Sequence, residues 1–162
     1  MEQDCRMADK QVVVFETVKA DPAVVYDLVA DLAQMGKWSP EATGGKWVGG
    51  ADGPALGAKF RGNNRAGWRR WSTSCEVTAA DRGKRFAFHV TVGPVPIADW
   101  SYEFAPDGTG TKVTEEWHDR RPGWMDSMSG LVMGVPDRAS HNRANMTETL
   151  KALKTAAERS AG

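Results

Sequence analysis

Cysteine and histidine are scarce in this sequence, and their scarcity argues against a disulfide framework and against a zinc site. The 162 residues contain two cysteines and three histidines. Cys5 lies in a polar N-terminal stretch and Cys75 in a predicted strand, so the two are not expected to form a disulfide framework. No spacing of cysteine and histidine resembles a zinc site. We therefore predict no metal ion and no cofactor.

Net charge and long apolar runs are also missing. The 21 basic side chains balance the 21 acidic ones, so the chain as a whole does not attract nucleic acid or an anionic membrane. No run approaches the about 18 apolar residues of a transmembrane helix, and no apolar segment of a signal peptide is present. We expect a cytoplasmic monomer or weak homodimer without membrane insertion or a nucleic-acid partner. Its predicted parts are a flexible leader (1–10) and one domain (11–160).

Aromatic residues, in contrast, are numerous. Seven Trp, five Phe and two Tyr occur beside 17 Gly. A single Trp usually belongs to the core. So many large rings together with small residues favour a chain that shapes a concave surface as well as a core.

The N-terminal third predicts a strand followed by helix. Residues 11–19 form a short segment rich in β-branched side chains, which is typical of a strand. Asp21 and Pro22 supply an N-cap oxygen and a suitable first-turn residue. Apolar residues at helical spacing follow, and Ser39 before Pro40 favours an end to the helical segment.

The middle of the chain predicts an antiparallel meander. Turn residues separate six short segments in which apolar and polar side chains alternate. These segments are 44–49, 57–65, 69–79, 84–92, 97–105 and 111–118. One face of the predicted sheet is therefore apolar and aromatic, and the other is polar.

The C-terminal part predicts a long helix that covers the aromatic face. Apolar residues recur every three or four positions over 137–158, and the sheet offers the surface on which they can pack. The preceding segment, 122–136, is rich in Met and interrupted by three glycines. Its pattern fits a short helix and a mobile loop equally well.

Several phrases in this order resemble one family. The opening signature of that family falls within residues 21–40 (DPAVVYDLVADLAQMGKWSP). The matching residues are Pro22, Val25, Tyr26, Leu28, Val29, Asp31, Trp38 and Pro40. The phrases GAKFRG, RRWSTSCEV, KRFAFHV, WSYEF and GTKVTEEW follow as successive strands. Over residues 11–158 the chain is similar to the START-like, or SRPBCC, superfamily of polyketide cyclase/dehydrase and lipid-transport proteins.

This resemblance implies an α+β helix-grip fold. A curved antiparallel sheet of about seven strands would wrap around a long C-terminal helix, with two short helices after the first strand. Members of the family commonly bind lipids, polyketides or other apolar molecules in a cavity between sheet and helix. The resemblance implies no particular reaction, because one fold serves many functions.

Glu115 is the most unusual residue on the predicted inner face. It shares the inward parity of Val113 and Trp117, and an unpaired buried carboxylate is costly. Such a group must find a donor, keep its proton through a raised pKa, or contact water. A ligand hydroxyl and Arg143 are candidate partners. The alternative is a solvated or paired carboxylate at the cavity entrance.

The same parity predicts the other residues of a binding site. Inward-facing rings, thioethers and a few polar groups would supply area and orientation for a ligand, although each of them taken singly fits core packing as well. Together with Glu115, the predicted ligand-binding residues are Asn64, Trp71, Thr73, Phe88, Trp100, Tyr102, Trp117, Met128 and Met146.

Basic and aromatic residues also gather on one predicted hairpin. Lys59, Arg61, Arg65, Arg69 and Arg70 surround Trp68 without an acid between them. Such a pattern can bind single-stranded nucleic acid or form a cationic rim over an anionic group. Acidic residues on later strands favour a solvated face with cross-strand pairs instead.

Three functions fit these features. The leading one is binding or transport of a hydrophobic small molecule, whether lipid, polyketide-like or aromatic. The second is a polyketide cyclase or dehydratase in which Glu115 is a general acid or base and Arg61 stabilises an enolate. The third is a regulatory or chaperone-partner interaction module, which would show an exposed apolar patch and no cavity.

Overall fold

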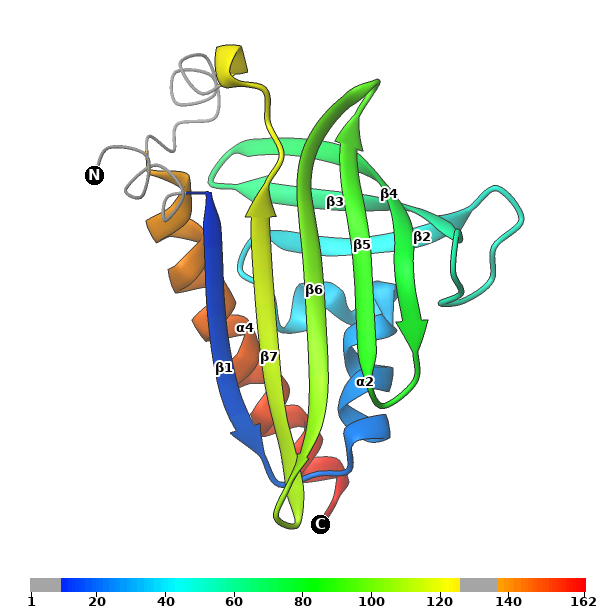
Figure 1. Cartoon of the computed structure of the whole chain (residues 1–162), viewed down its shortest axis with the longest axis vertical. Coiled ribbons are helices and arrows are strands. Elements are labelled where there is room, and N and C mark those ends of the chain that lie inside the picture. The colour runs from blue at the N-terminus through cyan, green and yellow to red at the C-terminus, as the bar shows by residue number, and fades with distance from the viewer. Residues whose placement is uncertain (1–9, 126–136) are drawn as a thin grey trace.

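The computed structural model describes residues 10–125 and 137–162, and Figure 1 shows a curved sheet that wraps around a long helix. Residues 123–125 are helical, and the rest of the segment predicted as a helix or loop, 126–136, lies outside the described residues. The elements in chain order are β1 (Gln11–Val18), α2 (Pro22–Ala30), η1 (Leu32–Lys37), β2 (Ala42–Val48), β3 (Lys59–Ala66), β4 (Arg69–Asp81), β5 (Arg85–Val92), β6 (Val95–Asp107), β7 (Gly110–Asp119) and α4 (Arg138–Ser160).

The sheet has seven antiparallel strands in the order β1-β7-β6-β5-β4-β3-β2. Register shifts interrupt the pairing of β2 with β3, of β4 with β5 and of β5 with β6. Such irregularities bend a strand and increase its twist. Figure 1 shows the result: β2 and β3 run across the direction of β1, β7 and β6. The prediction of an α+β helix-grip fold is confirmed.

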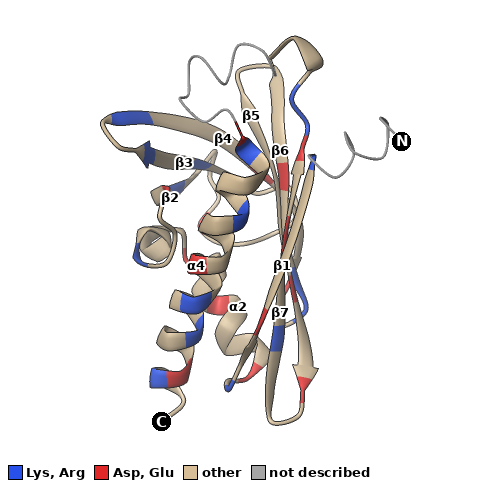
Figure 2. Cartoon of the chain, turned by 90° about the vertical axis from the view of Figure 1, so that its left-hand side faces the viewer, with Lys and Arg blue, Asp and Glu red and all other residues tan. Residues whose placement is uncertain are grey.

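The long helix lies on the concave side of this sheet. Figure 2 shows α4 between the β2–β3 side and the β1–β7 side of the molecule. Asp137 caps the helix by accepting a hydrogen bond from the Ser140 amide at 3.1 Å. The buried apolar side chains of α4 are Met146, Leu150, Leu153 and Ala157, which follow the predicted stripe. No helix within residues 10–125 or 137–162 is long and apolar enough to cross a bilayer.

The short helices close the other side of the core. Asp21 caps α2 through the Ala23 amide at 2.9 Å, as the Asp-Pro start predicts. Tyr26 on α2 makes edge-on contacts with Phe86 and Phe104 of the sheet. Tyr26 and these two rings thus fill part of the concave face of the sheet.

Gly110, the first residue of β7, gives a first test of the packing. A Cβ atom at this buried position would lie 2.2 Å from the Val18 carbonyl oxygen, which is backbone and cannot swing away. We expect Gly110→Ala to lower the free energy of unfolding by about 1–3 kcal/mol, measured by urea titration. The matched control is Gly53→Ala, because no heavy atom lies within 4 Å of a Cβ there. Equal stability of the two variants would contradict this packing.

Candidate ligand-binding site

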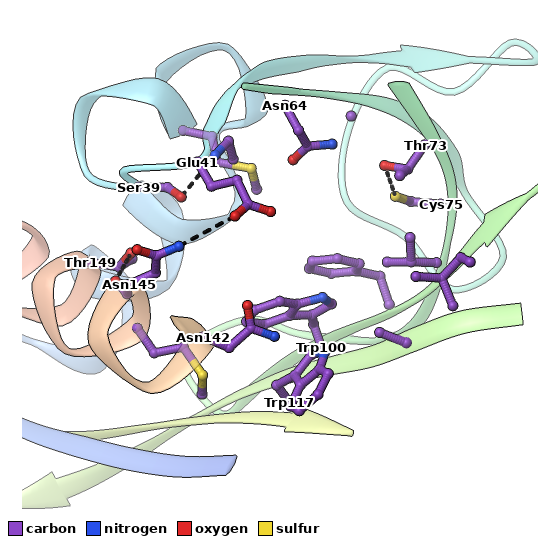
Figure 3. Close-up of a pocket in the computed structure, with 18 of the residues that line it drawn as sticks. Ser39, Glu41, Asn64, Thr73, Cys75, Trp100, Trp117, Asn142, Asn145 and Thr149 are labelled. Atoms are coloured by element: carbon purple, nitrogen blue, oxygen red, sulfur yellow. Dashed lines mark hydrogen bonds between the residues drawn. The ribbon is translucent and has the colours of Figure 1, made fainter. Parts of the chain in front are cut away.

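A cavity of about 370 Å³ lies between the concave face of the sheet, η1 and α4. Its wall is mostly apolar and contains side chains from η1, from β2 to β7 and from α4. Figure 3 shows side chains from the sheet, from the η1–β2 side and from α4 pointing toward this shared space. Aromatic side chains of the sheet line the cavity on one side, and residues of α4 line it on the other.

The structure places every predicted ligand-binding residue within its described ranges on this wall. Phe88, Tyr102, Trp117 and Met146 are buried, whereas the side chains from the β3–β4 end are partly exposed. The residues that line the cavity include Asn64, Trp71, Thr73, Phe88, Trp100, Tyr102, Glu115, Trp117 and Met146. Met128 lies outside the described residues.

Glu115 lies deep in the wall, with 2% of its surface exposed. The Tyr102 hydroxyl donates a hydrogen bond to Glu115 Oε1 at 2.7 Å, and Oε2 has no partner. Burial raises the pKa of Glu115 to about 8, although the hydrogen bond from Tyr102 acts in the opposite direction. The carboxyl group therefore holds its proton at neutral pH. It is not a solvated carboxylate at the cavity entrance.

Two predicted roles are wrong. Arg143 is exposed, and its guanidinium lies 3.5 Å from the Val13 carbonyl oxygen instead of near Glu115. Arg61 is exposed as well and does not line the cavity. Because Phe60 and Gly62 are turned inward, strand alternation turns Arg61 outward, where it cannot stabilise an enolate in the cavity.

The sequence analysis missed a polar cluster that joins β2 to α4. Glu41, just before β2, accepts hydrogen bonds from Arg138 and from Asn145 at 3.4 Å, and His141 Nε2 lies 2.9 Å from its Oε2. Figure 3 shows the Asn145 side chain directed at Glu41 across the edge of the cavity. Glu41 lies in a turn without periodicity, and the stripe of α4 was defined by apolar residues alone. Asn142 of α4 also lines the cavity, and helical spacing from Met146 would have placed it on the inner face.

The Glu41 carboxylate should hold the first turns of α4 in place. Its side chain is mostly buried, so its removal leaves Arg138 without its carboxylate. We expect Glu41→Ala to lower the free energy of unfolding by about 1–3 kcal/mol in a urea titration. Glu148, exposed on α4, supplies the control Glu148→Ala, for which we expect little change. Similar losses in both variants would show that the cluster does not stabilise the fold.

The basic side chains of the β3–β4 hairpin are not among the residues that line the cavity, although Asn64 and Trp71 of the same hairpin are. Figure 2 shows its Lys and Arg residues on the projecting β3–β4 segment. Trp68 is 86% exposed, with the Arg69 guanidinium 5.2 Å from its ring centre. The acids of the later strands pair elsewhere: Asp99 contacts His89 and Arg120. The face is thus solvated, and acids of the later strands form cross-strand pairs, such as Asp99 of β6 with His89 of β5.

The described residues contain no group of three His, Cys, Asp or Glu side chains placed to hold a metal ion. Cys75 lies in the cavity wall as a buried free thiol, and burial raises its pKa to about 11. The thiol is therefore protonated at neutral pH and not a reactive thiolate. What the wall offers a ligand is mostly apolar surface with a few hydrogen-bonding groups, and its charged side chains Glu41 and Arg138 pair with each other.

Known structures share this architecture. The polyketide-cyclase-like protein Cgl2372 from Corynebacterium glutamicum is 28% identical, with a TM-score of 0.59 over 89% of this chain and 88% of that one. Ginseng major latex-like protein 151 from Panax ginseng is 13% identical, with a TM-score of 0.68 over 91% and 96%. A protein from Thermus thermophilus is 19% identical, with a TM-score of 0.64 over 94% and 99%. The last two show the fold alone.

The search of curated proteins found no match. The family model described as polyketide cyclase / dehydrase and lipid transport, however, matches residues 9–158. This range includes every described residue of the cavity wall. The chain therefore belongs to the polyketide cyclase/dehydrase and lipid transport family.

Proposed function

We propose that the protein binds or transports a hydrophobic small molecule, such as a lipid, a polyketide-like compound or an aromatic compound, in the cavity between the sheet and α4. The observation that carries this proposal is the cavity of about 370 Å³ with its mostly apolar wall. Ligand sites in proteins commonly occupy about 300–1,000 Å³ and combine apolar lining with a few polar groups.

The position of the aromatic residues supports this function. Trp100 and Trp117 face one another across paired strands, and Met146 of α4 packs against the same cluster. Rings and a thioether can contact an apolar ligand over a large area, and the thioether adapts to ligands of different shape. An interaction module would need no such cavity, so the cavity favours ligand binding.

Titration with N-phenyl-1-naphthylamine tests the proposal, because this uncharged dye fluoresces strongly only in apolar surroundings. We expect saturable binding of one dye per chain, with a blue-shifted emission that a competing apolar molecule reverses. A fluorescence increase that stays linear with dye concentration would contradict a discrete site.

A second candidate function rests on Glu115. A protonated carboxyl group next to a tyrosine hydroxyl, inside an apolar cavity, has the properties of a general acid for a cyclase or dehydratase that acts on a polyketide. We expect Glu115→Gln to abolish turnover of a polyketide that the cavity accepts while its binding persists. Unchanged turnover in this variant would exclude the role.

A further inference from the structure

A second space, an open groove of about 650 Å³, lies beside the cavity between η1, the start of β2, the turn from β3 to β4 and α4. The residues that line both spaces include Ser39, Glu41 and Asn145, which therefore form a border between them. Figure 3 shows Glu41 and Asn145 facing one another at this border. The described lining of the groove contains no Phe, Tyr or Trp, so its chemistry differs from that of the cavity.

Two cationic side chains line the groove from different elements. Lys37 at the end of η1 donates a hydrogen bond to Gln34 Oε1 at 2.8 Å, and Arg65 of β3 donates from Nε to the Gly67 carbonyl oxygen at 3.1 Å. Both acceptors are uncharged. Neither cation forms an ion pair with a carboxylate in the part of the chain that the structure describes. Both charges are therefore available to an anion.

The position of Arg65 also costs stability. Arg65 lies directly opposite Arg70 in the pairing of β3 with β4, and both side chains are exposed. Like charges at directly opposed positions destabilise a sheet. The sequence from residue 59 to residue 75 contains no Asp or Glu that could offset them. An anion bound beside Arg65 would relieve this repulsion.

The carboxylate in the groove wall does not prevent anion binding. Among the described lining residues the acidic one is Glu41, whose side chain is 13% exposed. Its two oxygens contact Arg138 and His141. Because the positive charge of Arg138 offsets the charge of Glu41, the positive charges of Lys37 and Arg65 dominate the groove.

Uncharged polar groups complete the lining. Ser39 and Thr43 carry hydroxyl groups, and Asn145 carries an amide. The Ser39 hydroxyl oxygen accepts a hydrogen bond from the Ala42 amide at 3.1 Å, and the hydroxyl proton can still be donated. Such groups suit the oxygens of a polar molecule, whereas the described lining offers no large ring on which a nucleobase would stack.

We propose that the groove is a second binding site, which takes a phosphate monoester group between Lys37 and Arg65. A phosphate monoester carries a charge of about −1.5 to −2 near neutral pH, which matches two cations better than a single carboxylate does. The guanidinium of arginine presents donors in the geometry of phosphate oxygens. The site is independent of the proposed function, which concerns the apolar cavity.

Amide proton–nitrogen NMR spectra of the isotope-labelled protein test this site. Glucose 6-phosphate, gluconate and glucose are added in turn at constant pH and ionic strength. We expect glucose 6-phosphate to shift the amides of Lys37, Thr43 and Gly67 saturably, with an affinity at least about five-fold higher than that of gluconate. Tighter binding of gluconate, equal binding of glucose, or shifts confined to other regions would overturn the proposal.

Soluble sugar phosphates and the lipid phosphatidic acid both carry a phosphate monoester, and a vesicle experiment separates these sources. Vesicles of phosphatidylcholine, with and without phosphatidic acid at a ratio of about 4:1, are sedimented with the protein. Sedimentation that requires phosphatidic acid, without shifts from glucose 6-phosphate, would assign the group to a lipid. The reverse result would assign it to a soluble molecule. Binding of neither would overturn the proposal.

Arg65→Gln removes one of the two charges, and Arg61→Gln is its matched control. Arg61 lies on the same strand and the same outer face, is exposed, and does not line the groove. Arg65→Gln should weaken binding of the phosphate monoester at least about five-fold, and Arg61→Gln should change it by less than about two-fold. Both variants should bind N-phenyl-1-naphthylamine like the unmodified protein, which shows that they are folded. Equal phosphate affinity in the two variants would overturn the assignment to this groove.

Discussion

Replacing Thr73 with tryptophan is expected to abolish saturable binding of N-phenyl-1-naphthylamine while the protein stays folded. Thr73 on β4 lines the cavity at its less buried end, and its strand partner Gly62 has no side chain to block an indole. The large ring would therefore occupy much of the cavity of about 370 Å³. The dye titration with direct excitation of the dye measures the loss, and a urea titration checks the fold.

Ser74→Trp is the matched control for this experiment. Ser74 is the next residue of the same strand, is exposed, and points to the opposite face, so the same substitution adds an indole outside the cavity. Its dye affinity should equal that of the unmodified protein. If both variants bind the dye equally well, the dye does not occupy the space between the sheet and α4.

The buried carboxyl group of Glu115 should make the protein less stable as the pH rises from 5 to 8. Its pKa is raised from 4.5 to about 8 in the folded protein, so the folded state keeps a proton that the unfolded state has released. The free energy of unfolding then falls by about 1 kcal/mol per pH unit, or about 3–4 kcal/mol over this range. Below the pKa of Glu115 in the unfolded state both states are protonated. The stability that this carboxyl group contributes is then fully present and no longer changes with pH.

Glu115→Gln isolates this contribution. The amide cannot ionise, but its oxygen can still accept the hydrogen bond from Tyr102. Urea titrations at pH 5, 6, 7 and 8 should show that the fall in stability is smaller in the variant by about 1 kcal/mol per pH unit. Groups that titrate identically in both proteins cancel in the difference. Parallel pH profiles would mean that Glu115 is ionised in the folded protein.

The strands and helices were predictable because their side chains follow simple periods. Alternation along β4 and β5 assigned Thr73 and Phe88 to the concave face, and both line the cavity. The Asp21 cap and the stripe from Met146 to Ala157 fixed the two main helices in the same way. Periodicity and the family resemblance therefore accounted for the topology and for much of the cavity wall.

The polar part of the site was less predictable, because it depends on contacts between segments distant in sequence. Glu41 meets Arg138 and His141 from almost a hundred residues away, and its own turn has no pattern that indicates a buried position. Tyr102 meets Glu115 through the register of β6 and β7, which alternation alone does not give. Arg143 was placed inward because a helical stripe cannot distinguish its edge from its centre.

A crystal structure of the protein with N-phenyl-1-naphthylamine bound tests the central claim most directly. We expect the dye between α4 and the curved sheet, in contact with Trp100 and Trp117. A dye found on the outer surface instead, for example beside the exposed ring of Trp68, with the cavity side chains unmoved, would contradict it.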